Sequence, residues 1–510
     1  MANTTKLEHQ KELFGHPVGL YVLFFTETWE RFSYYGMRAL LVVYMTAKTM
    51  QANGQSGLGW LDGEALALYG WYTMLVYLMS IPGGFIADRY IGQKKAVFIG
   101  AILLTAGHGV LALEGLWAYY SGLGLVILGV GMLKPNISTM VGGLYAQNDI
   151  RRDKGFSIFY VGINLGSFLA SLSVGLVVKA YGWHAGFGLA GIGMLLGLLV
   201  YLYGQRFLVH VGNVPTVEEK SQDISISSLL GQLLKSPLQL GIVVLLLVYS
   251  VYAGFTYEGV DHWGYGALFA VLSVITGIMM MIYKNLNNQI EKDRYVVLLL
   301  SLLMVMVFWG CFEQMGGLMN LYAQEKTNRM FMGFEVPTAW FQGAGAGFII
   351  LLAVPIANFW AKRKLKGKEA SSLFKMGIGI VIMGIGFVYM VFATMEYEAN
   401  GSSAMYWLVL AYLFHTIGEL CLSPVSLSFF TKLAPQRYMA LMMGVYWAAT
   451  GLGNKLAGVI GESSVKAGEF NVFGGLFIFA VLFGLTVVLL LKPLKRLTHG
   501  AEDKETKIAH

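Results

Sequence analysis

Charged residues are scarce in this chain of 510 residues, since Asp, Glu, Lys and Arg together make up only 13%. A soluble domain carries about 25% charged residues, so a soluble globular fold is excluded for most of the chain. Hydrophobic residues make up 56%. Apolar runs of about 20 residues, the length of a helix that crosses a bilayer, recur from end to end. The sequence therefore predicts an all-α membrane protein.

Cysteine is almost absent, because Cys311 and Cys421 are the only two and both lie inside apolar runs. Neither a disulfide framework nor a cysteine-based metal site is supported. The nine histidines form no HExxH-like spacing, so we expect no metal and no organic cofactor. The segment Met1–His16 is polar and lacks the apolar centre of a signal peptide.

We expect fourteen membrane-spanning segments, arranged as six, two and six. The first six lie near 18–47, 65–87, 94–113, 117–140, 156–178 and 185–203, before a polar stretch. The middle pair lies near 238–256 and 264–284. The last six lie near 295–322, 338–361, 371–394, 404–430, 439–460 and 470–491.

The positive charges support this count. If the N-terminus is cytoplasmic and the sides alternate, most Lys and Arg residues fall in loops and tails on the inside, among them the run 362–368. This is the distribution that the positive-inside rule requires, and it places both termini in the cytoplasm. It also explains the net charge of +7 without nucleic-acid binding. The outside loops hold only Lys48, Lys179, Lys326, Arg329 and Lys466.

The two groups of six segments carry a weak internal repeat. Ile86-Ala87-Asp88 closes the second segment, and Ile356-Ala357-Asn358 lies at the matching place in the second half. Two six-helix halves are typical of the major-facilitator fold, in which the binding site lies between them at mid-membrane depth. The expected division is an N-terminal tail (1–17), a first bundle (18–205), a linker (206–237), an inserted helix pair (238–284), a second bundle (285–492) and a C-terminal tail (493–510).

The first segment carries ionisable side chains on one face. Each such group costs about 2.5–3.5 kcal/mol to insert into a membrane, so it faces a cavity or a partner. A ladder of ion pairs between helices is the structural alternative, although small residues build such interfaces at lower cost. Five side chains share a face about 100° wide: Glu27, Glu30, Arg31, Tyr34 and Arg38.

Further polar groups lie on the fourth, fifth, seventh and tenth bundle segments, namely Lys134, Asn164, Glu313 and Glu419. Lys134 could instead extend its ammonium to the interface, a single Asn can join helices, and a protonated Glu can bridge them. His415, one turn before Glu419, is expected to be a satisfied core histidine. The first half thus supplies cations and the second half carboxylates, which suits a zwitterion such as a dipeptide, whose ends lie roughly 5–6 Å apart.

The stretch Glu27–Tyr35 resembles the ExxERFxYY motif of the proton-dependent oligopeptide transporter (POT/PTR) family of the major facilitator superfamily. Leu133–Asn136, Phe156–Ser167, Phe308–Gln314 and Glu419–Pro424 also resemble the family in order and spacing. The resemblance covers almost the whole chain, and the inserted pair resembles the bacterial members. It implies a proton-coupled symporter of the bacterial inner membrane that imports di- and tripeptides, and we expect it to act as a monomer.

The resemblance also implies which residues bind a peptide. Its carboxylate would be bound by Arg31, Tyr35, Arg38 and Lys134, and its amino group by Asn164 and Glu419. Pockets for its side chains would be lined by Tyr77, Trp309 and Tyr446.

Proton coupling would fall to Glu27, Glu30 and Glu313, acting with Arg31 and Lys134, and Glu313 would pair with Lys134 in one state. The loop 84–95 resembles the cytoplasmic loop motif of major-facilitator proteins. Gating or contact between the bundles is therefore expected from Asp88 and Arg89.

Three features of the sequence depart from the family pattern. Gly345 and Ala346 stand where family members often have Asn-Pro, so one ligand of the amino group is missing. Phe312 precedes Glu313 where some relatives have two consecutive acids. Gly70 lies where animal members carry a histidine, which leaves coupling to carboxylates.

Three other functions compete with peptide import. The same fold could carry nitrate, another small anion or an amino-acid conjugate, although a pure anion site has less need of Glu419. A membrane enzyme would require a nucleophile–base set, a metal site or a cofactor motif, and the sequence shows none of these. A channel is disfavoured because channels commonly build their pores by oligomeric symmetry, whereas this chain has its own two-half repeat.

Overall fold

The computed structural model describes residues 11–48, 57–145, 149, 151–214, 226–257, 260–435 and 438–501. Parts of the predicted tails and of the predicted linker lie outside the described residues. Within the described part, twelve helical spans are long and apolar enough to cross a membrane. The other two predicted segments coincide with α2 and α17, each of 29 residues, which carry charged side chains within their spans.

The first six predicted segments coincide with helices whose ends agree within a few residues. Two short strands, β1 (Glu12–Leu13) and β2 (His16–Pro17), precede them and pair antiparallel. A five-residue π-helical turn, Ala87–Ile91, ends the second segment. The helices are α2 (Val18–Thr46), α3 (Asp62–Leu78), α4 (Ser80–Ile86), α5 (Gln93–Leu111), α6 (Leu116–Gly143), α7 (Arg152–Tyr181) and α8 (Trp183–Gly204).

The remaining eight predicted segments are also helical. The polar linker contains a short helix that the sequence did not predict, α9 (Ile226–Leu234). The other helices are α10 (Pro237–Thr256), α11 (His262–Lys284), α12 (Gln289–Phe312), α13 (Leu318–Glu325), α14 (Ala339–Leu365), α15 (Ser372–Asn400), α16 (Met405–Leu433), α17 (Met439–Ala467), α18 (Glu469–Leu489) and α19 (Leu491–Leu497). The short strands are β3 (Thr327–Asn328), β4 (Met330–Phe331), β5 (Phe334–Glu335) and β6 (Ser403–Ala404).

Contacts divide the chain into two compact units. The first unit comprises Met1–Trp60, Leu75–Lys220 and Asn320–Ile350. The second comprises Leu61–Met74, Ser221–Met319 and Leu351–His510. The predicted division into tails, bundles, linker and inserted pair remains a prediction.

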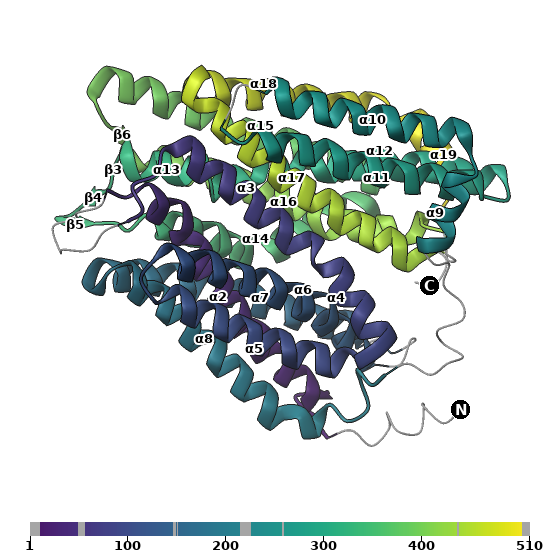
Figure 1. The fold of residues 1–510 in the computed structure, drawn as a ribbon, viewed down its shortest axis with the longest axis horizontal. Helices are drawn as coiled ribbons and strands as arrows, with labels where there is room; N and C mark the ends of the chain where they lie inside the picture. The colour runs from purple at the N-terminus through teal and green to yellow at the C-terminus, as the bar shows by residue number, and fades with distance from the viewer. Residues whose placement is uncertain are drawn as a thin grey trace. The chain divides into compact units, whose positions relative to one another are not determined.

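The packing partners of the helices repeat between the two halves of the sequence. In the first half, α2 packs against α7 and α8, and α5 packs against α6 and α8 (Figure 1). In the second half, α12 packs against α17 and α18, and α15 packs against α16 and α18. The first, third, fourth, fifth and sixth helices of each half therefore choose equivalent partners. The fold is a major-facilitator arrangement, as predicted, with α10 and α11 packed against each other as the inserted pair.

Glycines bring α5 and α6 into backbone contact. A methyl group on Gly129 would lie 2.9 Å from the carbonyl oxygen of Gly100 and 2.8 Å from the backbone nitrogen of Leu104. The equivalent pair α15 and α16 has the same feature, because a methyl group on Gly418 would lie 2.6 Å from the carbonyl oxygen of Gly379. Close approach through small residues is how membrane helices gain packing energy without a hydrophobic driving force.

Substitution Gly129→Ala should destabilise the protein by about 1–3 kcal/mol, because the added methyl group overpacks the contact between α5 and α6. Gly124→Ala in the same helix is the matched control, since a methyl group there meets no atom within 4 Å. The unfolding temperature of the detergent-purified protein measures both. An equal or larger loss in the Gly124 variant would contradict the role of the close contact.

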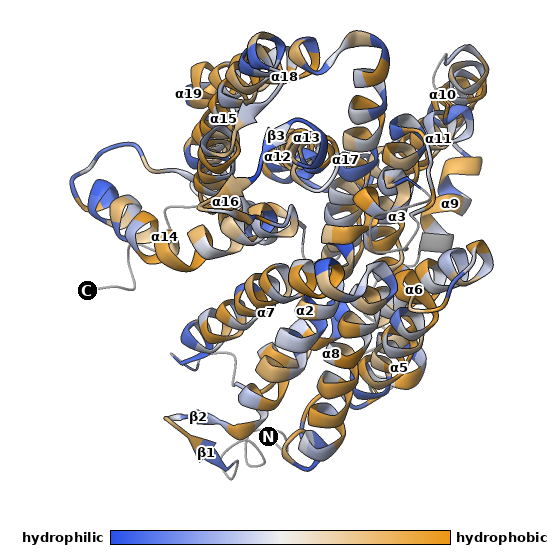
Figure 2. Cartoon of the chain, turned by 90° about the vertical axis from the view of Figure 1, so that its left-hand side faces the viewer, coloured by the Kyte–Doolittle hydropathy of each residue, from blue (hydrophilic) through white to orange (hydrophobic). Residues whose placement is uncertain are grey.

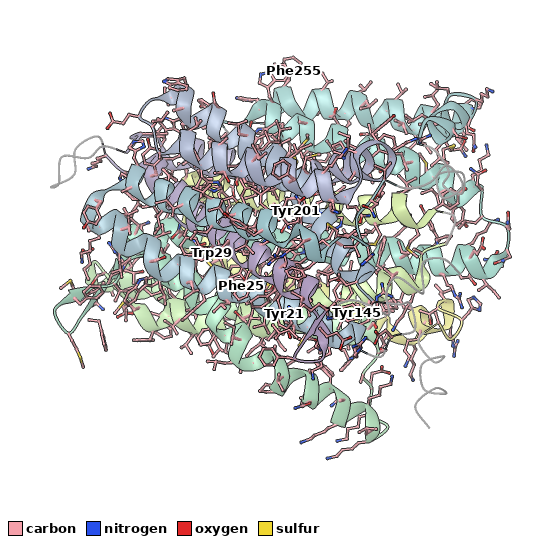
Figure 3. The ribbon with its side chains drawn as sticks, turned by 90° about the horizontal axis from the view of Figure 1, so that it is seen from below. Tyr21, Phe25, Trp29, Tyr145, Tyr201 and Phe255 are labelled. Atoms are coloured by element: carbon pink, nitrogen blue, oxygen red, sulfur yellow. The ribbon has the colours of Figure 1, made fainter. Side chains whose placement is uncertain are left out.

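The two faces of α2 differ in character. Tyr21, Phe25 and Trp29 follow one another at four-residue spacing along the helix (Figure 3), and Phe25 is exposed. At about 100° per residue, this aromatic stripe points opposite to the face that bears Glu27, Glu30 and Arg31. Hydrophobic residues likewise run along α5, α7 and α8 (Figure 2). The helix therefore presents its apolar side outward and its charged side to the interior of the first unit.

Both cysteines are buried free thiols. Cys311 on α12 is 2% exposed and Cys421 on α16 is 3% exposed. Each lies among apolar neighbours in its helix, as the sequence predicts, and the two side chains act as small hydrophobic residues.

Candidate functional site

Arg31 lies near the middle of α2 and forms ion pairs with two carboxylates of its own helix. Its Nε lies 2.9 Å from Oε1 of Glu27 and 2.5 Å from Oε2 of Glu30. All three side chains are buried. Because a buried charge that loses its partner is strongly destabilising, this group stays together in the folded protein. It leaves a net negative charge at this level of α2 when both carboxylates are ionised.

Aromatic rings surround the arginines of the same helix. The Arg31 guanidinium carbon lies 5.5 Å from the centre of the Tyr34 ring and 6.0 Å from that of Tyr35. Arg38 lies 5.6 Å from the Tyr35 ring. Such contacts are cation–π interactions. They help to fix the direction of both guanidinium groups, so the predicted carboxylate-binding residues Arg31, Tyr35 and Arg38 lie together.

Lys134 and Tyr77 are also in contact. The Lys134 ammonium lies 3.8 Å from the centre of the Tyr77 ring, and Lys134 is only half-buried on α6. Asn164 on α7 is buried and donates a hydrogen bond of 3.0 Å to the carbonyl of Tyr160 one turn earlier. All predicted peptide-binding residues of the first half thus belong to the first compact unit.

Asp88 and Arg89 lie in the π-helical turn after α4, and both are exposed. Gln93 donates a hydrogen bond of 3.2 Å to Asp88, and the Arg89 guanidinium carbon lies 5.7 Å from the Phe85 ring. A π-helical turn is uncommon and often marks a functional position. The gating role of Asp88 and Arg89 stays a prediction.

Glu313 lies where α12 ends, and this differs from the continuous helix that the apolar run 295–322 suggests. The helix α12 ends at Phe312, and Glu313–Met315 form a 3-10 turn. The glycines Gly316 and Gly317 follow and both donate backbone hydrogen bonds to the Glu313 carbonyl. Consecutive glycines are poor helix formers, which explains the break.

The Glu313 carboxylate accepts a hydrogen bond of 2.8 Å from the hydroxyl of Tyr69 on α3. Both side chains are buried, and both belong to the second compact unit. No pattern in the sequence indicates this contact, because a tyrosine in an apolar helix is ordinary. Tyr69 is therefore a candidate functional residue that only the structure identifies.

The other predicted residues of the second half lie on α12, α16 and α17. Trp309 contacts Phe308 and Phe312, with ring centres 5.6 and 5.3 Å away. The Tyr446 hydroxyl lies 2.8 Å from that of Ser426, which links α17 to α16. Glu419 is half-buried on α16.

His415 is a core residue, but it is not satisfied as predicted. It is fully buried, and its ring centre lies 4.6 Å from that of Phe387. Within the described part of the chain, neither of its ring nitrogens has a hydrogen-bond partner. The packing on Phe387, rather than polar contacts, holds this ring in place.

A groove of about 780 Å³ lies among α10, α11, α12 and α17 in the second unit. Its walls are mostly apolar side chains such as Leu272, Met279 and Leu302, and the predicted site residues do not line it. In the described ranges, no group of three or more His, Cys, Asp or Glu side chains could hold a metal ion. The groove is therefore not a candidate for the functional site, and the polar clusters described above remain the candidates.

Comparison with known proteins identifies the family. The model of the POT family (PTR2) matches residues 94–474. The peptide transporter YePEPT of Yersinia enterocolitica is 36% identical over 534 residues, covering 99% of this chain and all of that protein. The di-/tripeptide transporter of Lactococcus lactis subsp. cremoris is 35% identical, with 98% and 99% covered.

Solved structures agree with these sequence relatives. The crystal structure of a peptide transporter POT in complex with sulfate is 34% identical to this chain and superposes with a TM-score of 0.83. The alignment covers 98% of this chain and 99% of that one. Similarity of sequence and fold thus extends over almost the whole length, and this chain belongs to the POT family.

Proposed function

We propose that this protein is a symporter that couples the import of di- and tripeptides to the entry of protons. The observation that carries the proposal is the buried group of Glu27, Glu30 and Arg31 on a helix that is long enough to cross a membrane. Charges inside the membrane are costly and mark substrate or ion pathways. The relatives named as peptide and di-/tripeptide transporters give the substrate class.

The distribution of charge supports a zwitterionic substrate. The first half supplies Arg31, Arg38 and Lys134, which would bind the carboxylate of a peptide with Tyr35. The second half supplies Glu419, which would bind the amino group with Asn164. Small anions such as nitrate have no group for a carboxylate to bind. Side-chain pockets would be lined by Tyr77, Trp309 and Tyr446.

The proposed coupling is a competition for one cation. Lys134 can pair either with the Glu313 carboxylate or with the carboxylate of a bound peptide. A proton on Glu313 removes the first partner and frees Lys134 for the second. Glu27 and Glu30 would take part in the proton coupling together with Arg31. A ligand shifts a conformational equilibrium only through such a difference in affinity.

In this proposal the chain lies in the bacterial inner membrane as a monomer, with both termini in the cytoplasm, because that orientation satisfies the positive-inside rule. Asp88 and Arg89 then lie on the cytoplasmic side and would act in gating there. The proton is the coupling ion, and no other cofactor is invoked.

Tyr69→Phe tests the proposed role of Glu313. The variant removes the hydroxyl that donates to the Glu313 carboxylate. Because a hydrogen bond to a charged group contributes about 1.5–3 kcal/mol, and each 1.4 kcal/mol is about a factor of ten, the accumulation of peptide under a pH gradient should fall by about tenfold or more. Tyr397→Phe near the end of α15 is the control, and an equal loss of accumulation in both variants would count against the proposal.

Uptake by proteoliposomes tests the function itself. Labelled dialanine should accumulate when the outside is made acidic and should not accumulate without the gradient. Unlabelled dialanine and trialanine should compete, whereas nitrate should not. Competition by nitrate alone would assign the fold to a small anion, and passive equilibration that ignores the proton gradient would indicate a channel.

A further inference from the structure

The outer ends of the inserted pair are joined to α17 by a network of polar contacts. Asp261 lies just before α11, where its carboxylate accepts a hydrogen bond of 2.8 Å from the backbone of Gly264. The same carboxylate forms an ion pair with Lys455 of α17. The Lys455 side chain is completely buried, and that of Asp261 is 13% exposed. The inserted pair thus supplies the counter-charge for a cation in the interior of the protein.

The helix α3 takes part in the same network. Trp71 donates an indole hydrogen bond of 3.1 Å to Asp261, and its ring lies 4.9 Å from the Lys455 ammonium. Lys455 also donates to the carbonyl of Ala67 at 3.5 Å. The backbones of α3 and α17 touch here, since a methyl group on Gly70 would lie 3.0 Å from the Cα of Gly458.

Glu462, two turns further along α17, holds the loop before α11. Its carboxylate accepts hydrogen bonds from the backbone nitrogens of Val260 and Asp261 and from the hydroxyl of Tyr257 at 3.1 Å. The Tyr257 ring stacks on Tyr265 with centres 4.4 Å apart. Asp261 is therefore fixed in position by α11 and α17. Because of this, little further conformational entropy is lost when its side chain pairs with Lys455.

We propose that Asp261, Lys455 and Trp71 form a latch by which the inserted pair controls the opening of the transporter to the outside. The proposal rests on the alternating-access function above. In the proposed topology, α3 begins, α17 ends and α10 connects to α11 on the outer side. The part of α3 in this contact lies in the same compact unit as α17, although α3 belongs to the first half of the repeat and α17 to the second. In the proposal, the contact between the two helices breaks when the halves separate on that side. Asp261 bridges both helices and stabilises the closed state.

Asp261 acts in this proposal as a positioning group. Its carboxylate is held by the ammonium of Lys455, the indole of Trp71 and the backbone of Gly264, and its own backbone nitrogen donates to Glu462. The latch therefore acts through the position of Asp261 between α3, α11 and α17.

The test measures uptake of external dialanine as a function of concentration in proteoliposomes. Asp261→Asn weakens the closed state and raises the outward-open fraction, so the external concentration for half-maximal uptake should fall by about threefold or more. The maximal rate should also fall, because the return to the closed state is slower. Trp71→Phe should shift the half-maximal concentration in the same direction by less.

A structural role alone predicts a different result. Fewer folded molecules would lower the maximal rate per total protein but would leave the half-maximal concentration unchanged, and that result with Asp261→Asn and Trp71→Phe would overturn the latch. If the wild-type protein takes up no peptide at all, the proposed function fails instead. The thermal stability of each variant, measured in detergent, separates loss of folded protein from a shifted equilibrium.

Discussion

Replacing Glu313 by glutamine is expected to abolish uphill accumulation of peptide while leaving exchange of peptide across the membrane. Glutamine keeps the size of the side chain and can still accept a hydrogen bond from Tyr69, whose hydroxyl lies 2.8 Å from the carboxylate. It cannot gain or lose a proton at neutral pH. Without a titratable group at position 313 the proton gradient no longer biases the competition for Lys134, so the accumulation ratio should fall to about 1.

The measurement compares two assays on the same proteoliposomes: accumulation under an imposed pH gradient, and exchange of labelled for unlabelled dialanine without one. Glu398→Gln is a suitable control because Glu398 lies exposed near the end of α15. Full accumulation in the Glu313 variant would end the proposed competition for Lys134. Loss of both activities with normal folding would show that Glu313 is needed for peptide binding rather than for coupling.

Arg31→Lys is expected to reduce peptide uptake by about tenfold to a hundredfold while the protein still folds. Lysine keeps the positive charge that Glu27 and Glu30 require. It loses the planar guanidinium, which can contact two carboxylates at once and stack on Tyr34 and Tyr35. One lost hydrogen bond to a charged group is about 1.5–3 kcal/mol, and each 1.4 kcal/mol is about tenfold in binding.

The loss should lie mainly in the apparent affinity for peptide, which concentration-dependent uptake measures. Arg206→Lys, at an exposed position after α8, should behave as wild type. Arg31→Ala should give little folded protein, because two buried carboxylates then lose their cation. Wild-type affinity in Arg31→Lys would remove Arg31 from the proposed peptide site.

The apolar runs of the sequence predict the helices well because each run has the length of a membrane crossing. The ends of α5, α11 and α16 lie within a few residues of their predicted limits. The helical period also places Glu27, Glu30 and Arg31 on one face of α2, where they form one cluster. The limits of the helices and the shared face of α2 both depend on residues that are close in the sequence. Both can therefore be predicted without the structure.

Contacts between residues that are far apart in the sequence are harder to predict from it. Tyr69 and Glu313 are separated by 244 positions, and Lys455 and Asp261 by 194, so no local pattern connects them. A useful sign was nevertheless present, because a lysine inside a membrane helix needs an anion. The partner of Lys455 is Asp261, which lies in a loop just outside the predicted segment 264–284.

Two local features also escaped prediction. The short helix α9 lies in a polar stretch, where no run of membrane length draws attention to it. The π-helical turn Ala87–Ile91 contains one residue more than an α-helical turn. The pattern of hydrophobic residues does not predict this extra residue. Predicted roles that need both halves of the chain, such as the pairing of Lys134 with Glu313, remain predictions.

The burial of both native thiols has a practical consequence for spectroscopy. Reagents that modify cysteine attack exposed thiolates, whereas Cys311 and Cys421 are 2% and 3% exposed. A single cysteine introduced at an exposed position, for example at Tyr181 or Leu365, would carry essentially all of the label. Spin probes and fluorophores can therefore report on this transporter without first removing its own sulfhydryl groups.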